Sequence, residues 1–368
     1  MTITLTTIIK KLLLLFLVIA GLYFAKVFLM PLCFGAILAT LFLPFCNWLQ
    51  RKKIPKFLAV VTCLLSVILI IGILLTLIGW KLSDLIKDVE GLKENIEDTG
   101  FLLQTYIFDK FGLSFKDQLI ILEKEQPSYS NIMQTMAGSL SSFFGNLFLV
   151  YIYFIFLLYY RSHIKQFLLK ISLDKNRFEM EKIIQTITKV SQQYLLGLFK
   201  MIVCLWILYG IGFSALGIDD ALFFAILCGF LEIVPYVGNI VGTFLTVFIA
   251  ALHGAHFATL GGIIAVYATV QTFQGWVLEP VIVGPQVKIN PLFTILSLVL
   301  GQLLWGIPGI ILAIPLTGIL KIIFDHLEPL KPYGFLIGEI ENTKEKRGLV
   351  KIVKEAIGRI KRVFTTSK

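Results

Sequence analysis

The residues of this 368-residue chain that could do chemistry are polar side chains set inside apolar segments near its C-terminal end. Glu232 is the only acid of the apolar stretch 222–250, and it begins the interruption Glu-Ile-Val-Pro-Tyr-Val-Gly-Asn at 232–239. A carboxyl group at membrane depth can bind a cation or carry a proton, because desolvation penalises its charged form. The alternative is that this stretch crosses the membrane completely and places Glu232 at the water interface as a solvated acid.

The interruption itself supplies a second group of candidates for binding. Glycine lets the backbone approach a ligand closely, and free amides at the start of a half-helix attract anionic or hydroxylated groups. A plain turn between two helices would use the same residue types for packing. These candidates are Pro235, Tyr236, Gly238, Asn239 and Gly242, with Lys200 as a counter-charge for Glu232 unless it snorkels to the headgroups.

Amide side chains, prolines and glycines form a third group. Gln271 and Gln274 lie toward the end of the apolar segment 257–278, and Gln302 lies in the apolar stretch 292–324. An unpaired amide is costly in lipid, so each glutamine either binds substrate or holds two helices together. The other candidates come from the Pro/Gly-rich loop expected at 279–291 and from a second interruption, Gly-Ile-Pro-Gly: Glu279, Pro280, Gly284, Pro291, Gly306, Pro308 and Gly309.

Several classes of chemistry have no support in the sequence. The five cysteines have neither paired spacing nor a neighbouring His, so no metal site and no cofactor is expected. No Ser/His/Asp or Cys/His arrangement and no Walker motif is present, so we expect neither an enzyme nor a protein driven directly by ATP. The net charge of +10 arises in short loops and one tail, which makes nucleic acid an unexpected partner.

The composition indicates that most of the chain lies in lipid. Hydrophobic residues make up 57% and charged residues 15%, whereas soluble domains carry about 25% charged residues. The apolar segments predict an all-α polytopic membrane protein with about six to eight transmembrane helices. Its first partner is therefore the lipid bilayer.

Two apolar stretches, 222–250 and 292–324, are interrupted in the middle. Each arm is roughly 14–16 residues, which as a helix rises about 21–24 Å and falls short of the ~30 Å hydrocarbon core. Backbone groups freed by Pro and Gly survive at membrane depth only inside protein or beside a water-filled cavity. Paired interrupted segments of this kind point to the binding site of a transporter. Two short complete spans joined by a tight turn are the alternative.

Loop charges orient the chain in the membrane. The segments 51–56, 161–189 and 344–368 are basic, whereas 81–125 holds six Lys against ten Asp and Glu. Basic loops stay in the cytoplasm, so both termini are expected there and the acidic segment outside.

These features divide the chain into five expected parts. Residues 1–80 form three spans, 81–138 an acidic extracytoplasmic helical insert, and 139–190 a fourth span with a basic cytoplasmic connecting helix. Residues 191–325 form a transport module, and 326–368 a basic amphipathic cytoplasmic tail. A shift of 71 residues aligns 235–238 with 306–309, and oppositely directed helices precede the two hairpins. The module is therefore expected to be an inverted repeat of two re-entrant-like hairpins whose tips meet.

The stretch 230–242, Phe-Leu-Glu-Ile-Val-Pro-Tyr-Val-Gly-Asn-Ile-Val-Gly, resembles the signature of the autoinducer-2 exporter-like (AI-2E) family of bacterial membrane proteins. The stretch 278–315, with its Glu-Pro, Asn-Pro and Pro-Gly pairs, resembles it too. Asn239 departs from the signature, since many members carry Pro after the Gly. The resemblance implies export of autoinducer-2 or, as in other members, sodium/proton antiport, and it implies a homo-oligomer, a pentamer.

The sequence therefore predicts a secondary transporter that exports a small polar organic solute such as autoinducer-2. A monovalent cation (sodium)/proton antiporter with Glu232 as its exchange site is the alternative. An antiporter of that kind is expected to carry more than one intramembrane carboxylate, which favours the organic solute. A membrane scaffold without transport is a further alternative, and it leaves the two interrupted hairpins unexplained.

Overall fold

The computed structural model describes residues 5–87, 129–172, 177–235, 237–283 and 288–339. Over these ranges the regular secondary structure is helical, and the only β-type pairing is an isolated bridge between Ile289 and Gly338. Five of these helices are long and apolar enough to cross a membrane. The expected all-α polytopic membrane protein is confirmed. The insert 88–128 and the tail 340–368 lie outside the described residues.

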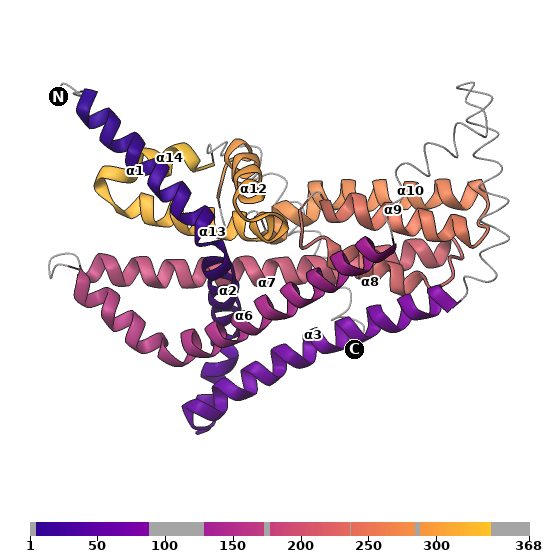
Figure 1. Cartoon of the computed structure of the whole chain (residues 1–368), viewed down its shortest axis with the longest axis horizontal. Helices are drawn as coiled ribbons and strands as arrows, with labels where there is room; N and C mark the ends of the chain where they lie inside the picture. The colour runs from indigo at the N-terminus through magenta and orange to yellow at the C-terminus, as the bar shows by residue number, and fades with distance from the viewer. Residues whose placement is uncertain (1–4, 88–128, 173–176, 236, 284–287, 340–368) are drawn as a thin grey trace, which may run out of the picture.

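The first half of the chain has four described helices (Figure 1). These are α1 (Leu5–Phe24), α2 (Lys26–Arg51), α3 (Lys56–Lys87) and α6 (Tyr129–Ile171). Three of them, α2, α3 and α6, build a core. Cys46 of α2, Cys63 of α3 and Phe154 of α6 are fully buried where the three helices meet. Arg161 closes one end of this core, because its Nη2 donates to Asn47 Oδ1 at 2.7 Å and to Gln50 Oε1 at 3.0 Å.

The helices α6 and α7 (Arg177–Ala215) are much longer than a membrane span. They have 43 and 39 residues, so each rises roughly 60 Å against the ~30 Å of a hydrocarbon core. The basic segment 161–189 forms the end of α6 and the start of α7, not the separate connecting helix that we expected. Lys165 Nζ on α6 and Glu181 Oε1 on α7 pair at 2.7 Å and join the two projecting ends.

Two interrupted hairpins follow, at the positions that the apolar pattern predicts. The first is α8 (Ala221–Leu231) with α9 (Val237–Leu252), and the second is α12 (Pro291–Trp305) with α13 (Ile307–His326). Three of the arms, with 11, 16 and 15 residues, are too short to cross a membrane. The arm α13 differs from the expectation, since this 20-residue helix is long and apolar enough to span a membrane.

Glycines let the arms of both hairpins pack closely. A Cβ at Gly238 would collide with the carbonyl oxygen of Leu231, and one at Gly309 would collide with the carbonyl oxygen of Gly301. Gly306 plays a different part, because its φ of 67° and ψ of −146° lie in a region that is open almost only to glycine. Close contact therefore requires glycine at 238 and 309, and backbone conformation requires it at 306.

Between the hairpins the chain forms one long helical segment with a change of helix type. It starts as α10 (Phe257–Phe273) and continues as the π-helix η2 (Gln274–Val283). We expected a loop from Glu279 onward, because Pro280 would clash with the preceding turn of an α-helix. The wider π turn relieves that clash, and the helix runs on to Val283.

The end of the described chain is fastened to the start of the second hairpin. After η3 (Glu328–Leu330) comes α14 (Lys331–Ile337). The Asn290 side chain accepts a hydrogen bond from Phe293 N at 2.9 Å, which caps α12, and donates to Leu336 O at 2.8 Å. One residue thus starts α12 and holds the end of α14.

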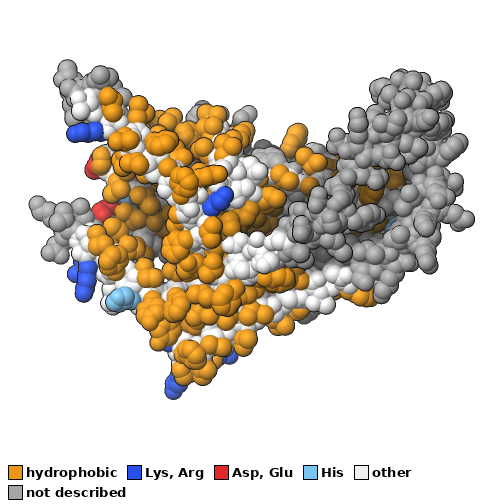
Figure 2. Space-filling view, in the orientation of Figure 1, with side chains coloured by type: hydrophobic (Ala, Val, Ile, Leu, Met, Phe, Trp, Pro, Cys, Tyr) orange, Lys and Arg blue, Asp and Glu red, His pale blue; other side chains and the backbone are white. Residues whose placement is uncertain are grey.

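The outer surface has the character of a lipid contact. Figure 2 shows one face covered largely by hydrophobic side chains, with most Lys and Arg side chains toward its left and lower edges. Large apolar side chains such as Phe16, Leu69 and Phe244 are exposed on α1, α3 and α9. In water such a surface would aggregate, so it is matched to a bilayer.

Candidate functional site

The break in the first hairpin brings Glu232 into the interior of the protein. The helix α8 ends at Leu231, and Glu232 follows as its C-cap residue. The backbone then turns, and Gly238 N donates to Val234 O at 2.9 Å as α9 begins. Glu232 is only 5% exposed, so its carboxyl group is shielded from solvent.

Four polar side chains from four other elements form a hydrogen-bonded network with this carboxyl group. Glu232 Oε1 accepts from Gln274 Nε2 at 2.7 Å and from Asn239 Nδ2 at 3.3 Å. Asn239 Nδ2 also donates to Gln271 Oε1 at 2.7 Å, and Gln271 Nε2 donates to the hydroxyl of Tyr209 at 3.0 Å. We call these five residues, Tyr209, Glu232, Asn239, Gln271 and Gln274, the Glu232 cluster. Helices α7, α9 and α10 with η2 therefore converge on the end of α8.

Two acceptor atoms of the Glu232 cluster are buried without a hydrogen-bond donor. They are Glu232 Oε2 and Asn239 Oδ1, and neither has a partner among the described residues. A buried acceptor without a partner destabilises a protein by about 1–3 kcal/mol, and more if it is charged. Both atoms are oxygens, which a proton or a small hard cation would satisfy.

The other candidates of the first hairpin serve its packing or lie outside the description. Gly242 packs against Cys228, with a Cβ there 3.3 Å from Cys228 Cα. Pro235 is partly buried in the turn, and Tyr236 is outside the described residues. Lys200 is exposed on α7 and forms no ion pair with a described residue, so it does not neutralise Glu232.

The candidates of the second hairpin do not join the Glu232 cluster. Gln302 is exposed, and Pro291 occupies the first position of α12 behind its Asn290 cap. Gly306, Pro308 and Gly309 shape the turn into α13. Gly284 and the side chain of Pro280 are outside the described residues.

The two hairpins nevertheless touch through apolar contacts. Val234, in the break of the first hairpin, packs against Leu298 of α12 and against Ile310 and Ala313 of α13. Val234 lies within the first break and Ile310 directly follows the second, so this contact brings the two breaks near each other.

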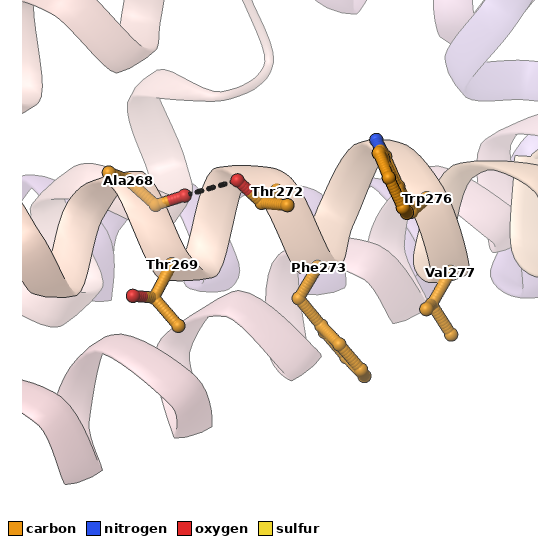
Figure 3. Close-up of a pocket in the computed structure, with 6 residues that line it drawn as sticks. All are labelled: Ala268, Thr269, Thr272, Phe273, Trp276 and Val277. Atoms are coloured by element: carbon orange, nitrogen blue, oxygen red, sulfur yellow. Dashed lines mark hydrogen bonds between the residues drawn. The ribbon is translucent and has the colours of Figure 1, made fainter.

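A cavity of about 500 Å³ lies along α10 and η2, away from the Glu232 cluster. Figure 3 shows six of its residues: Ala268, Thr269, Thr272, Phe273, Trp276 and Val277. The hydroxyl groups of Thr269 and Thr272 donate to the carbonyl oxygens of Ala265 and Ala268 in their own helix. The cavity therefore presents mainly apolar surface and suits an acyl chain better than a hydroxylated solute.

Sequence reasoning missed Tyr209, which is buried on α7 and completes the Glu232 cluster. A tyrosine in a predicted span looks like an ordinary aromatic residue of a lipid-facing helix. The available signal was its hydroxyl group, which needs a partner once the ring is buried.

Comparison with known proteins places the chain among membrane transport proteins. The model of the AI-2E family transporters matches residues 12–328. The "Putative transport protein YueF" of Bacillus subtilis is 28% identical over 323 residues, which cover 83% of this chain and 85% of that protein. The "Putative transport protein YrrI" of the same organism is 26% identical over 82% of this chain and 87% of that protein. A "Putative transport protein" of Borreliella burgdorferi is 24% identical over 84% of each.

Proposed function

The chain belongs to the AI-2E transporter family, and from that premise we propose that it is a secondary transporter whose Glu232 cluster binds a monovalent cation, a proton or sodium. The unpaired oxygen Glu232 Oε2 carries this proposal. Membership of the family makes the protein a membrane transporter, and the position of the buried acid supports an ion as one transported species.

The hydrogen bonding of the Glu232 cluster favours a cation over an anion or a neutral solute. Each described donor nitrogen of Asn239, Gln271 and Gln274 already has an acceptor, whereas two acceptor oxygens lack a donor. An anionic group would find more acceptors than donors here. A cation would bind between the free oxygens at the end of α8, where the carbonyl end of the helix dipole also attracts positive charge.

Autoinducer-2 or a similar small polar organic solute is the second candidate, as the cargo that a cation gradient would drive. The description of the matching family, AI-2E, supports it. Such a solute would enter between the hairpins only after Val234 separates from Leu298 and Ile310. The exported solute and the bound cation would then occupy neighbouring positions.

The same proposal includes the setting of the protein. We propose a multi-pass protein of the bacterial inner membrane with both termini in the cytoplasm, assembled as a homo-oligomer. Loop charges support the orientation, and the family resemblance supports the pentamer.

Transport by purified protein in proteoliposomes tests the function. With imposed proton, sodium and autoinducer-2 gradients, the wild type should move a cation, with or without the solute. Glu232→Gln should abolish cation movement, because an amide neither ionises nor exchanges a proton, while the amount of protein in the membrane stays near normal. Ion-sensitive dyes inside the vesicles report each cation.

Glu328→Gln is the matched control, since Glu328 is an exposed acid paired only with Lys331. It should transport like the wild type. An active Glu232→Gln variant with unchanged cation coupling would contradict the proposal. If the wild type transports autoinducer-2 at the same rate with and without the proton and sodium gradients, only the second candidate remains.

A further inference from the structure

A second carboxylate lies beside the Glu232 cluster because of the π-helix η2. In an α-helix, residues five apart point roughly 140° away from each other. The i→i+5 hydrogen bonding of a π-helix turns them toward the same side. Gln274 and Glu279 are five apart within η2, so the π turn places Glu279 on the side of the helix from which Gln274 Nε2 donates to Glu232 Oε1 at 2.7 Å.

The three side chains differ in their access to the surface. Glu232 and Gln274 are 5% and 2% exposed, whereas Glu279 is exposed. The order Glu279, Gln274, Glu232 therefore leads from the surface into the interior. The π-helix is held in this place by α7, where a Cβ at Gly197 would come within 2.8 Å of Ile282 O.

We propose that Glu279 is an outer acceptor site for the monovalent cation, from which the cation passes along Gln274 to Glu232. This inference rests on the proposed function. It places the entry position of the cation on the side of the membrane toward which η2 lies, called the η2 side. It also makes Gln274 a positioning residue that holds both carboxylates. On the orientation proposed above, the η2 side is the cytoplasmic side.

The chemistry of the three groups suits this transfer. The amide of Gln274 has two N–H donors, so it can support one carboxylate with each. Two neighbouring carboxylates repel each other, and this repulsion favours one cation held between them over two empty sites. If the cation is a proton, its O–H bond at Glu279 breaks as an O–H bond at Glu232 forms, and Gln274 keeps both of its amide protons. A sodium ion exchanges carboxylate oxygens in the same order.

Sided transport assays test the outer site. Inside-out and right-side-out membrane vesicles present the cation to opposite faces of the protein. Glu279→Gln should raise the half-saturating concentration of sodium or protons by about tenfold, the effect of losing one close charge, on the η2 side only. The maximal rate at saturating cation should stay within about twofold. A merely structural role would change both faces alike.

Two further variants sharpen the result. Glu279→Asp keeps the charge but moves it away from Gln274, so the half-saturating cation concentration should rise less, and on the same side. This variant serves as the test if Glu279→Gln is missing from the membrane. Glu328→Gln, an acid outside the Glu232 cluster, should change neither side. Equal effects on both faces, no effect on either, or complete loss of transport in Glu279→Gln would overturn the outer site. Absence of cation movement in the wild type would instead overturn the proposed function.

Discussion

Gln274 supplies the shortest hydrogen bond to the buried carboxyl group of Glu232. Its Nε2 lies 2.7 Å from Glu232 Oε1, whereas the second donor, Asn239 Nδ2, lies at 3.3 Å. Because Glu232 Oε2 has no described donor, the loss of Gln274 would leave the acid with one long hydrogen bond. The contribution of Gln274 to the stability of the protein therefore depends on the charge of residue 232.

A double-mutant cycle measures this dependence. Gln274→Leu should lower the stability of the wild type by about 1–3 kcal/mol, since it removes a donor from a buried acid. In the Glu232→Gln background the same change should cost at least about 1 kcal/mol less, because a neutral amide is easier to bury. The midpoint of thermal unfolding in one detergent, compared across the four proteins, gives the coupling.

Gln302→Leu is the matched control for this cycle, because Gln302 is an exposed glutamine on α12. Its effect should be small and the same in both backgrounds. Additive effects of Gln274→Leu and Glu232→Gln would mean that the hydrogen bond between them contributes little.

At this scale the sequence predicts which residues are chemically able to act, but not which of them meet. Glu232, Asn239, Gln271 and Gln274 are each visible as polar groups in apolar segments. Their convergence depends on how α8, α9 and α10 pack, which spacing along the chain does not encode. The same limit explains why Gln302, of the same residue type, stays outside the Glu232 cluster.

At the scale of elements, the first hairpin depends on how closely its two arms approach. At Gly238 the start of α9 lies against the carbonyl oxygen of Leu231, the last residue of α8. The φ angle of Gly238 is not positive, so the glycine is required by contact and not by backbone conformation. A side chain of any size would push α9 away from Glu232.

Replacing Gly238 by Ala should therefore damage the protein far more than the same change in open space. We expect Gly238→Ala to lose at least about 1–3 kcal/mol of stability, the usual result of overpacking, and to lose cation transport with it. Gly261→Ala on α10, where a Cβ meets nothing within 4 Å, should be neutral or slightly stabilising. Purified yield, thermal unfolding and transport of the two variants make the comparison. Equal behaviour would show that α8 and α9 yield easily at the break.

The bounds of the interrupted hairpins were predictable because they depend on apolar length and on local turn residues. The start of α12 at Pro291 and the turn at Gly306 follow from Pro at a helix start and Gly at a positive φ. The π-helix was not predictable. Pro280 predicts a helix end in sequence, whereas the structure continues through it as a π-helix whose Ile282 lies close to Gly197 of α7.

At the scale of the whole molecule, several helix ends and connections lie toward two opposite ends of the structure. Figure 1 places the start of α1, the α6–α7 connection and α14 toward one end, and the turn between α9 and α10 toward the other. The ion pair Lys165–Glu181 lies at the first end, and His253 and His256 flank the turn at the second. The positive-inside rule predicts that the first end lies in the cytoplasm.

Cysteine labelling in intact cells checks this orientation. In a background without the five native cysteines, His256→Cys should react with an impermeant maleimide reagent before lysis, and Glu328→Cys only after it. Both positions are exposed, so access to the reagent is governed by the side of the membrane. Labelling of Glu328→Cys in intact cells would reverse the topology, and with it the side assigned to Glu279.

The contact between the two hairpins could not be read from the internal repeat. The alignment of 235–238 with 306–309 predicts tips that meet each other. Val234, within the first break, packs against the cluster of Leu298, Ile310 and Ala313 in the second hairpin, and the choice of these side chains does not follow from the alignment. The way in which two apolar surfaces pack depends on the fit of particular side chains. A 71-residue offset carries no information about that fit.

The great length of α6 and α7 connects the ends of these helices with the interior of the protein. Their ends extend past the bilayer, and the Lys165–Glu181 pair ties the two arms together near the tip. Further along, α7 carries Tyr209 of the Glu232 cluster and abuts the π-helix at Gly197. We therefore expect a displacement of α7 to reach the residues around Glu232 through these two contacts. The described ends of α6 and α7 and the Glu232 cluster are thus linked through a single helix, α7.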